Sequence, residues 1–187
     1  EDGLGLIVTK DDSVTYTMSD ALGNRKIFIN GFLSQMIDRN GNKTVLLYNT
    51  ESYSASGTGW HPTSNGQLRK VIYIPDGESP ITVATLTYDA STKYLTSVTD
   101  RAGRVTTFDL DYEHLTRIND PDGQKSEYRY NGNLFRMIRA YDAESGYGLG
   151  FSYASNSSDS GANGNRVVEF YDYIASSRDN NDAVKHN

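Results

Sequence analysis

The sequence predicts an all-β fold in which stacked antiparallel β-hairpins form a curved sheet ribbon. Three observations predict it: a hairpin-like pattern that recurs along the chain, an abundance of tyrosine, and no long stretch with helical periodicity. The 187 residues include 14 Tyr but one Trp, and only 36% of them are hydrophobic. This composition suits an extended sheet with half-exposed side chains, because tyrosine combines an apolar ring with a polar tip.

The clearest repeats lie between residues 93 and 153, with a period of about 20 residues. Leu95 and Leu115 each start a unit. Each is followed three residues later by an apolar residue and then by an Asp-x-x-Gly turn. Aromatic or apolar residues stand five and seven positions after the turn glycine. The residues that define the repeat are Leu33, Asp38, Gly41, Leu95, Asp100, Gly103, Phe108, Leu115, Asp120, Gly123, Tyr128, Leu134 and Gly146.

We expect each unit to be one β-hairpin. The turn aspartate accepts hydrogen bonds from nearby backbone N–H groups, and the glycine tolerates positive φ. The residues at positions five and seven after the glycine lie on one face, because side chains alternate along a strand. The leucine and its apolar partner three residues on do not alternate, so either the leucine precedes the paired region or a bulge lies between them. Neighbouring hairpins must cover one another, since a single hairpin cannot bury its apolar face.

The other elements follow from local patterns. Strands are expected at residues 4–8, 14–18 and 26–29, and Asn30-Gly31 reads as a tight turn into the first complete unit. A last strand is expected at residues 167–174.

We expect one β domain spanning residues 1–174. Ser-, Gly- and Asn-rich segments interrupt it as loops at residues 50–66 and 154–166. The polar residues 175–187 read as a flexible tail. The chain begins with Glu1 rather than Met, so we expect it to be a segment of a longer protein.

Charge and composition exclude several function classes. The net charge is −6 and no basic run exists, which argues against nucleic-acid binding. No apolar run is long enough for insertion into a membrane. The absence of cysteine excludes disulfides and thiol chemistry. The arginines of the repeats alternate with acidic residues, so cross-strand ion pairs are expected.

The best candidate for ligand binding lies in the first loop. Trp60 and His61, with Tyr53 nearby, could stack on a sugar ring while neighbouring polar groups bond its hydroxyls. The alternative is that Trp60 folds back to cover the open end of the sheet. Tyrosines on the sheet surface offer the same two alternatives, a sugar platform or cross-strand packing: Tyr88, Tyr112, Tyr128, Tyr130 and Tyr153.

Catalysis and metal binding receive little support. Glycoside hydrolysis needs two carboxyl groups, one with a raised pKa, but the repeat already explains nearly all acids in the chain. The acids considered are Asp109, Asp111, Glu113, Glu127, Asp142 and Glu144. The Asp/Asn-rich segments 38–42, 156–165 and 179–182 carry oxygens suited to Ca²⁺, but none matches an EF-hand loop. No enzyme, no cofactor and no metal site is predicted.

The repeat resembles the YD repeats of RHS-repeat proteins, a family that includes bacterial RHS and polymorphic toxins, the shell subunits of insecticidal toxin complexes, and teneurins. The matching stretches are Leu33 to Gly41, Tyr88-Asp89, Leu95 to Gly103, Leu115 to Gly123, Tyr130-Asn131-Gly132, Leu134 and Tyr141-Asp142. The resemblance implies a spiralling sheet ribbon that forms a hollow shell in long members. Five or six units are too few to close a large shell.

From the resemblance we expect a non-catalytic shell or stalk segment of a larger secreted or cell-surface bacterial protein. Its partners would be neighbouring domains of the same polypeptide. The alternative is a carbohydrate-binding module that uses Trp60 and surface tyrosines, with glycans as partners.

Overall fold

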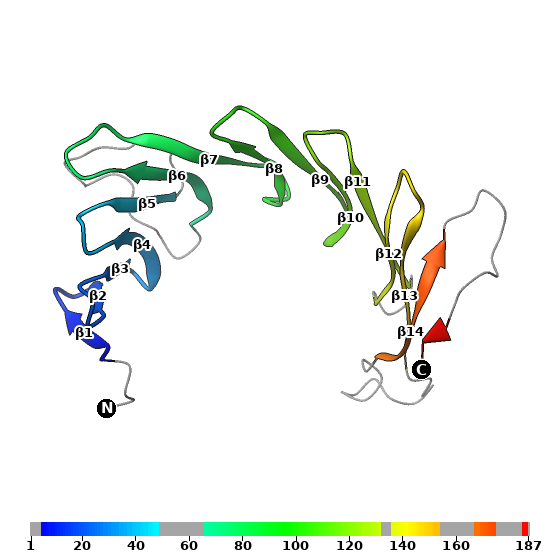
Figure 1. Cartoon of the computed structure of the whole chain (residues 1–187), viewed down its shortest axis with the longest axis horizontal. Coiled ribbons are helices and arrows are strands. Elements are labelled where there is room, and N and C mark those ends of the chain that lie inside the picture. Colours follow the sequence, from blue (N-terminus) through cyan, green and yellow to red (C-terminus); the bar gives the residue numbers. More distant parts are fainter. Residues whose placement is uncertain (1–4, 49–65, 132–135, 154–166, 175–184, 187) are drawn as a thin grey trace. The chain divides into compact units, whose positions relative to one another are not determined.

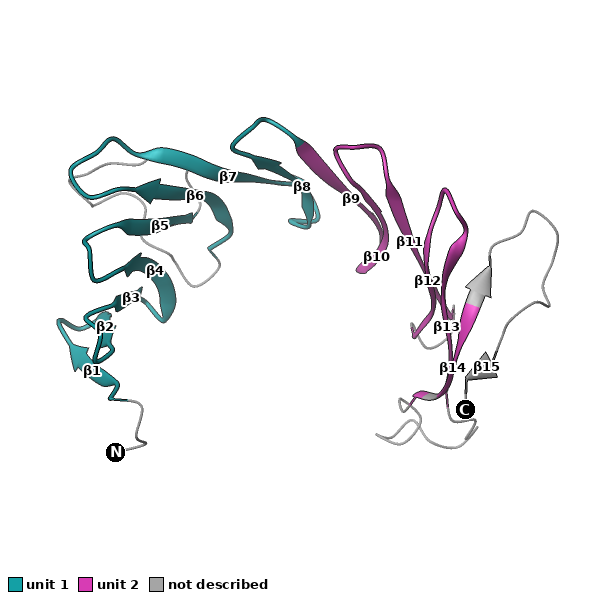
Figure 2. Ribbon diagram, in the orientation of Figure 1, with its two compact units in different colours: residues 1–104 teal, residues 105–187 magenta. Residues whose placement is uncertain are grey.

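The computed structural model describes residues 5–48, 66–131, 136–153, 167–174 and 185–186. Every regular element within these ranges is a β-strand (Figure 1), which confirms the predicted all-β class. The chain divides into two compact units, residues 1–104 and 105–187 (Figure 2). Nearly all of the two expected loops, and most of the expected tail, lie outside the described residues.

Unit 1 is an antiparallel sheet in which each strand pairs with its neighbour in sequence. Its strands are β1 (Ile7–Lys10), β2 (Thr15–Ser19), β3 (Arg25–Ile29), β4 (Phe32–Ile37), β5 (Lys43–Tyr48), β6 (Leu68–Ile74), β7 (Ile81–Tyr88) and β8 (Leu95–Asp100). The expected tight turn between β3 and β4 is present, because Asn30 and Gly31 both have positive φ angles, of 52° and 83°.

Unit 2 has the same sequential antiparallel pairing. Its strands are β9 (Val105–Asp111), β10 (His114–Asn119), β11 (Lys125–Tyr130), β12 (Met137–Asp142), β13 (Tyr147–Tyr153), β14 (Val167–Ile174) and β15 (Lys185–His186). Within the segment expected to be a tail, Lys185 and His186 pair with β14. The expected hairpin chemistry therefore organises both units.

A β-bulge recurs near the start of the first strand of the repeat unit. In β10 the register with β9 shifts between Leu115 and Arg117, so Thr116 has no counterpart on β9. Because the bulge adds one residue, Leu115 and Ile118 reach the same face of the sheet although they are three residues apart. The structure thus selects the bulge from the two explanations of this spacing. The equivalent extra residues in other strands are Ser34, Arg69, Thr96 and Ile138.

The bulge also places the third clear repeat in register. Met137 pairs with Tyr130 and directly precedes the bulge, so it occupies the position that the sequence pattern gave to Leu134. Leu134 itself lies outside the described residues. The spacing between the residue that opens the unit and the turn glycine differs here, partly because the turn is longer. The Gly146 N–H donates to the carbonyl of Asp142, four residues back.

The described hydrophobic core is small and lies in unit 1. Val45, Leu47 and Ile72 form a buried cluster, with exposed fractions of 1%, 0% and 4%, and Ile74 packs against it. Val45 faces Ile72 across the β5–β6 ladder, so the cluster is a cross-strand contact within one sheet. In the described part of unit 2 no hydrophobic side chain is fully buried.

Candidate functional surfaces

The Asp-x-x-Gly turns are closed by their own aspartates. The Asp38 carboxylate accepts the backbone N–H groups of Asn40 and Asn42 at 2.8 and 3.0 Å, and the Asn42 side-chain amide at 2.7 Å. Gly41 has a φ of 89°, which an L side chain rarely adopts. These bonds, led by the one from the Asn42 side chain, lower the pKa of Asp38. The Asp38 oxygens, considered above as possible Ca²⁺ ligands, are thus engaged by the turn itself.

The same carboxylate bonding recurs in other turns of both units. Asp20 and Asp100 accept bonds from backbone N–H groups two and four residues ahead and from a side chain four residues ahead. Hydrogen bonds lower the pKa of each turn carboxyl in the set Asp20, Asp38, Asp89, Asp100 and Asp142. In each of these residues, the deprotonated carboxylate is therefore the form that stabilises the turn.

Three repeat tyrosines are anchored at the bulges. Each stands at the end of the second strand of its hairpin, and its hydroxyl donates to the main-chain carbonyl just before the bulge on the first strand. The pairs are Tyr48 to Leu33 at 3.0 Å, Tyr88 to Leu68 at 2.9 Å and Tyr153 to Met137 at 2.7 Å. A bulge disrupts the local ladder, so a side-chain donor there stabilises a main-chain acceptor. Of the two alternatives for the surface tyrosines, the structure shows a cross-strand bond for Tyr88 and Tyr153.

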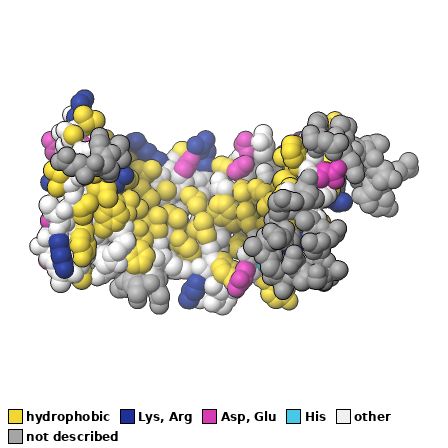
Figure 3. All heavy atoms as spheres, turned by 90° about the horizontal axis from the view of Figure 1, so that it is seen from below, with side chains coloured by type: hydrophobic (Ala, Val, Ile, Leu, Met, Phe, Trp, Pro, Cys, Tyr) yellow, Lys and Arg dark blue, Asp and Glu magenta, His cyan; other side chains and the backbone are white. Residues whose placement is uncertain are grey.

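Each unit carries rows of partly exposed apolar side chains that pair across its strands. In unit 2, Phe108 pairs with Ile118, and Tyr128 with Ala140, which in turn pairs with Leu149. In unit 1 the corresponding rows join Leu46, Val71 and Ala84, and Leu86 with Val98. Figure 3 shows hydrophobic side chains gathered in a band, with Lys, Arg, Asp and Glu side chains toward its margins. These side chains stabilise the sheet without being removed from solvent completely.

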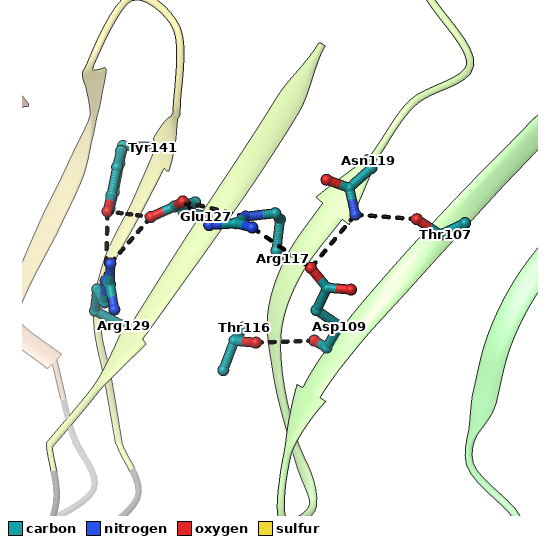
Figure 4. Close-up of polar contacts among 8 residues, drawn as sticks. All are labelled: Thr107, Asp109, Thr116, Arg117, Asn119, Glu127, Arg129 and Tyr141. Carbon is teal, nitrogen blue, oxygen red and sulfur yellow. Dashed lines mark hydrogen bonds and ion pairs between the residues drawn. The ribbon is translucent and has the colours of Figure 1, made fainter. Parts of the chain in front are cut away.

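A polar row crosses β9 to β12 in unit 2 (Figure 4). Glu127 lies at its centre, with a side chain only 13% exposed. Its Oε1 accepts from Arg117 at 2.6 Å, and its Oε2 accepts from the Tyr141 hydroxyl at 2.5 Å and from Arg129 at 3.1 Å. The register aligns Arg117, Glu127 and Tyr141 on adjacent strands, so the row is a cross-strand ladder.

The electrostatics of this row identify it as a stabilising network. The bond from Tyr141, followed by the bond from Arg117, lowers the pKa of the Glu127 carboxyl. Burial, with the bond to Glu127, raises the pKa of the Tyr141 hydroxyl. A general acid needs a raised carboxyl pKa near neutral pH. The pKa of Glu127 is shifted in the opposite direction, because its hydrogen bonds favour the charged carboxylate of an ion pair.

The row continues to Asp109, which lies 3.7 Å from Arg117 and 3.4 Å from the Asn119 amide. Sequence reasoning gave Asp109 and Glu127 no specific partners. A signal was present, because Arg117 and Glu127 flank the Asp120–Gly123 turn at positions that a hairpin brings opposite each other.

A pocket of about 210 Å³ opens near the ends of β9, β10 and β11. Its lining includes Asp111, Tyr112, His114, Tyr128, Tyr130 and Asn131. The His114 and Tyr130 rings are in contact, with centroids 4.9 Å apart. Sequence reasoning considered three of these tyrosines as a sugar platform but did not foresee a pocket.

The loop site predicted from the sequence, Tyr53, Trp60 and His61, lies outside the described residues. Within the described ranges, no group of three or more Asp, Glu or His side chains is arranged to hold a metal ion. In those same ranges no helix is long and apolar enough to cross a membrane.

Comparison with family models found no match, and no curated protein matched the chain. Similar solved structures include TcdB2-TccC3, with a TM-score of 0.41 and 16% identity over 88% of this chain and 10% of that chain. TcdB2-TccC3 without its hypervariable C-terminal region has a TM-score of 0.42 and 16% identity, over 87% of this chain and 9% of that chain. The Photorhabdus luminescens Tc holotoxin pore has a TM-score of 0.40 and 16% identity, over 84% of this chain and 9% of that chain. This chain therefore spans about a tenth of the length of each of these larger chains.

Proposed function

We propose that this chain is a non-catalytic structural segment of the YD/RHS-repeat kind, forming part of a shell or stalk in a larger protein. The observation that supports the proposal is a set of interactions that recurs in several hairpins. In the β4–β5, β6–β7 and β12–β13 hairpins, a bulge, a turn that contains Asp and Gly, and a tyrosine that bonds the bulged strand follow one another in the same order. The tyrosine joins the two strands of its own hairpin, and the bulge lies in the ladder to the preceding hairpin. An extended wall requires such a repeated connection between neighbouring units.

The distribution of buried surface supports this proposal. A globular enzyme or binding domain of this size buries a large core, whereas the described residues contain only five buried hydrophobic side chains. In addition, every carboxyl whose pKa is shifted in the described ranges is shifted downward. A wall segment needs such stabilising carboxylates and does not need a general acid.

The expected partners are neighbouring domains of the same polypeptide, which would cover the ends of the sheet and its apolar face. The expected location, from the family resemblance, is outside a bacterial cell or on its surface. The first strand is suited to continuing a sheet: β1 pairs with β2 on one side, and Ile7 and Val8 are 64% and 60% exposed.

Sedimentation velocity of the isolated chain over a range of concentrations tests this proposal. We expect self-association through the uncovered edge and a clear reduction by Val8→Lys, because an edge lysine opposes strand pairing. Leu149→Lys is the control, since Leu149 is also exposed but lies in β13, where it pairs with Ala140 on one side and Asp172 on the other. A chain that remains monomeric at every concentration and unfolds as one cooperative domain would contradict the proposal.

A further inference from the structure

The β10–β11 hairpin opens toward its base, and the pocket of about 210 Å³ lies along this opening. The ladder between the two strands ends at Arg117 and Glu127. Toward the base, His114 pairs with β9 and Tyr130 pairs with β12, so each strand is still held on its other side. The walls of the pocket are therefore part of the sheet of unit 2.

Four aromatic side chains line this pocket. The His114 and Tyr130 rings are in contact, tilted by 59° with centroids 4.9 Å apart. Tyr128 lies on the same face of β11 as Tyr130, because side chains alternate along a strand. Tyr112 is the fourth. The pocket therefore presents several ring surfaces within one small volume.

Tyr112 adopts an unusual conformation for its residue type. It lies in the two-residue connection between β9 and β10, with a φ of 51°. Glycine, asparagine and aspartate usually occupy such a position, because a bulky side chain is strained there. Tyr112 is 84% exposed, so burial of its ring does not offset the strain. A strained, exposed aromatic residue that lines a pocket indicates a role in binding.

The charges around the pocket favour a cation. Arg129 lines the pocket, but its guanidinium group donates to Glu127 at 3.1 Å. The polar row sets Arg117 and Arg129 against Asp109 and Glu127, so its formal charges cancel (Figure 4). The Asp111 carboxylate, which also lines the pocket, adds a negative charge beyond this balance. It attracts a cation and repels an anion.

The rings and the size of the pocket point to a compact organic cation. Ring faces attract cations electrostatically, and clusters of aromatic rings recognise quaternary ammonium groups. A volume of about 210 Å³ is below the roughly 300–1,000 Å³ of pockets for drug-sized ligands, so it suits one compact group. A metal ion requires several oxygen or nitrogen ligands, and no group of three or more acidic or histidine side chains in the described ranges is arranged to hold one.

We propose that this pocket binds a trimethylammonium group, which packs against the Tyr112 and Tyr130 rings beside the Asp111 carboxylate. Free choline or the headgroup of a choline lipid could carry this group. The site adds a ligand to the proposed structural role and does not depend on it, because a wall segment can carry a ligand site or lack one.

Saturation-transfer NMR on the full chain tests the proposal with two probes. One is choline, and the other is dimethylbutanol, the neutral analogue in which a carbon atom replaces the charged nitrogen. We expect transfer to choline and much weaker transfer to the neutral analogue, because the rings and the carboxylate act on the charge. Flotation with phosphatidylcholine vesicles identifies the source: binding to the vesicles indicates a lipid headgroup, and binding to choline alone indicates the free cation.

Two substitutions remove the groups that contact the cation. Tyr130→Leu removes a ring face and should weaken choline binding about two- to thirtyfold. Asp111→Asn removes the charge but keeps the shape, and binding should weaken about two- to fivefold. The controls are Tyr147→Leu, at a tyrosine that is 64% exposed in β13, and Glu113→Gln, at an exposed acid of the β9–β10 turn. Neither control should change binding.

Tyr112→Asn separates binding from folding. Asparagine tolerates positive φ, so the variant should unfold at the same temperature as the parent chain or at a higher one. Its affinity for choline should nevertheless fall about two- to thirtyfold, because a ring face is lost.

Three results would overturn the proposal. The first is no transfer to choline, or equal transfer to choline and dimethylbutanol. The second is choline binding that Tyr130→Leu, Asp111→Asn and Tyr112→Asn all leave unchanged. The third is binding that is lost in Trp60→Ala but retained in Tyr130→Leu, which would place the cation at the loop. A loss of choline binding with unchanged self-association of the chain would leave the structural role intact, so the two proposals fail separately.

Discussion

The β4–β6 region of unit 1 and the β10–β12 region of unit 2 share one hairpin pattern but are stabilised by different interactions. In the first, Val45, Leu47 and Ile72 are buried in a hydrophobic cluster. In the second, Glu127 joins Arg117 and Tyr141 in a polar ladder, and hydrophobic side chains remain partly exposed. The comparison shows that turn, bulge and strand pairing define the repeat. The side chains of the strands can make either hydrophobic or polar contacts within that pattern.

Leu47→Ala should have the largest effect on stability. Leu47 is fully buried, and truncating a buried leucine costs about 2–5 kcal/mol of unfolding free energy through lost burial and an unfilled cavity. The measurement is chemical denaturation followed by circular dichroism. Leu149→Ala in unit 2 makes the same change at a side chain that is 42% exposed, and its cost should be much smaller. Equal costs would remove the distinction between the two regions.

Glu127→Gln should have the next largest effect. The substitution keeps the shape of the side chain but removes the charge that two arginines and Tyr141 bond, at a cost of about 1–3 kcal/mol. Thermal unfolding of the variant measures it. Glu113→Gln, an exposed residue between β9 and β10, is the control and should unfold like the parent chain. A Glu127→Gln variant as stable as its control would show that the polar ladder contributes nothing.

Tyr153→Phe should lower stability by about 0.5–1.5 kcal/mol, the range for one neutral hydrogen bond. The lost bond joins the Tyr153 hydroxyl to the Met137 carbonyl at 2.7 Å. Tyr147→Phe, at a tyrosine that is 64% exposed, provides the control for removing a hydroxyl. Differential scanning calorimetry measures the melting temperatures of both variants. Equal melting temperatures would refute a stabilising role for the Tyr153 hydroxyl at the bulge.

Acid should weaken the turns of both units by a small amount per turn. Hydrogen bonds lower the pKa of Asp20, Asp38, Asp100 and Asp142 in the folded chain. Unfolding therefore takes up protons below about pH 4, near the pKa of an unperturbed aspartate. The stabilisation is complete above this pH and is lost as the pH falls through the lowered values. Urea midpoints between pH 7 and pH 2.5 should show this loss, and a flat profile would contradict it.

Much of the fold could be predicted because the hairpin signals are local. The Asn30-Gly31 turn and the Asp–Gly turns follow from the conformational preferences of two or three adjacent residues. The bulge was one of two open explanations, since the three-residue spacing of Leu115 and Ile118 fits no regular strand. The position of Met137 was missed because a longer turn shifts the register by an amount that the period does not reveal.

The candidate surfaces were harder to predict. The Glu127 network depends on which residues face each other across three strands, and a one-residue change in register would separate them. The sequence shows that Leu110 stands where three other hairpins carry a bonding tyrosine, but it does not show that the Tyr130 ring lies against His114. The tyrosines themselves were identifiable, but their hydroxyl partners were not.

The central claim is that each hairpin is stabilised by its immediate neighbours, as in a wall segment, and not by one common core. Hydrogen exchange of Leu47→Ala and Glu127→Gln tests this claim most directly. The account predicts lost amide protection around β4–β6 in Leu47→Ala and around β10–β12 in Glu127→Gln, with the other region protected as in the parent chain. Equal loss of protection over both regions in either variant would show a single cooperative core and would contradict the account.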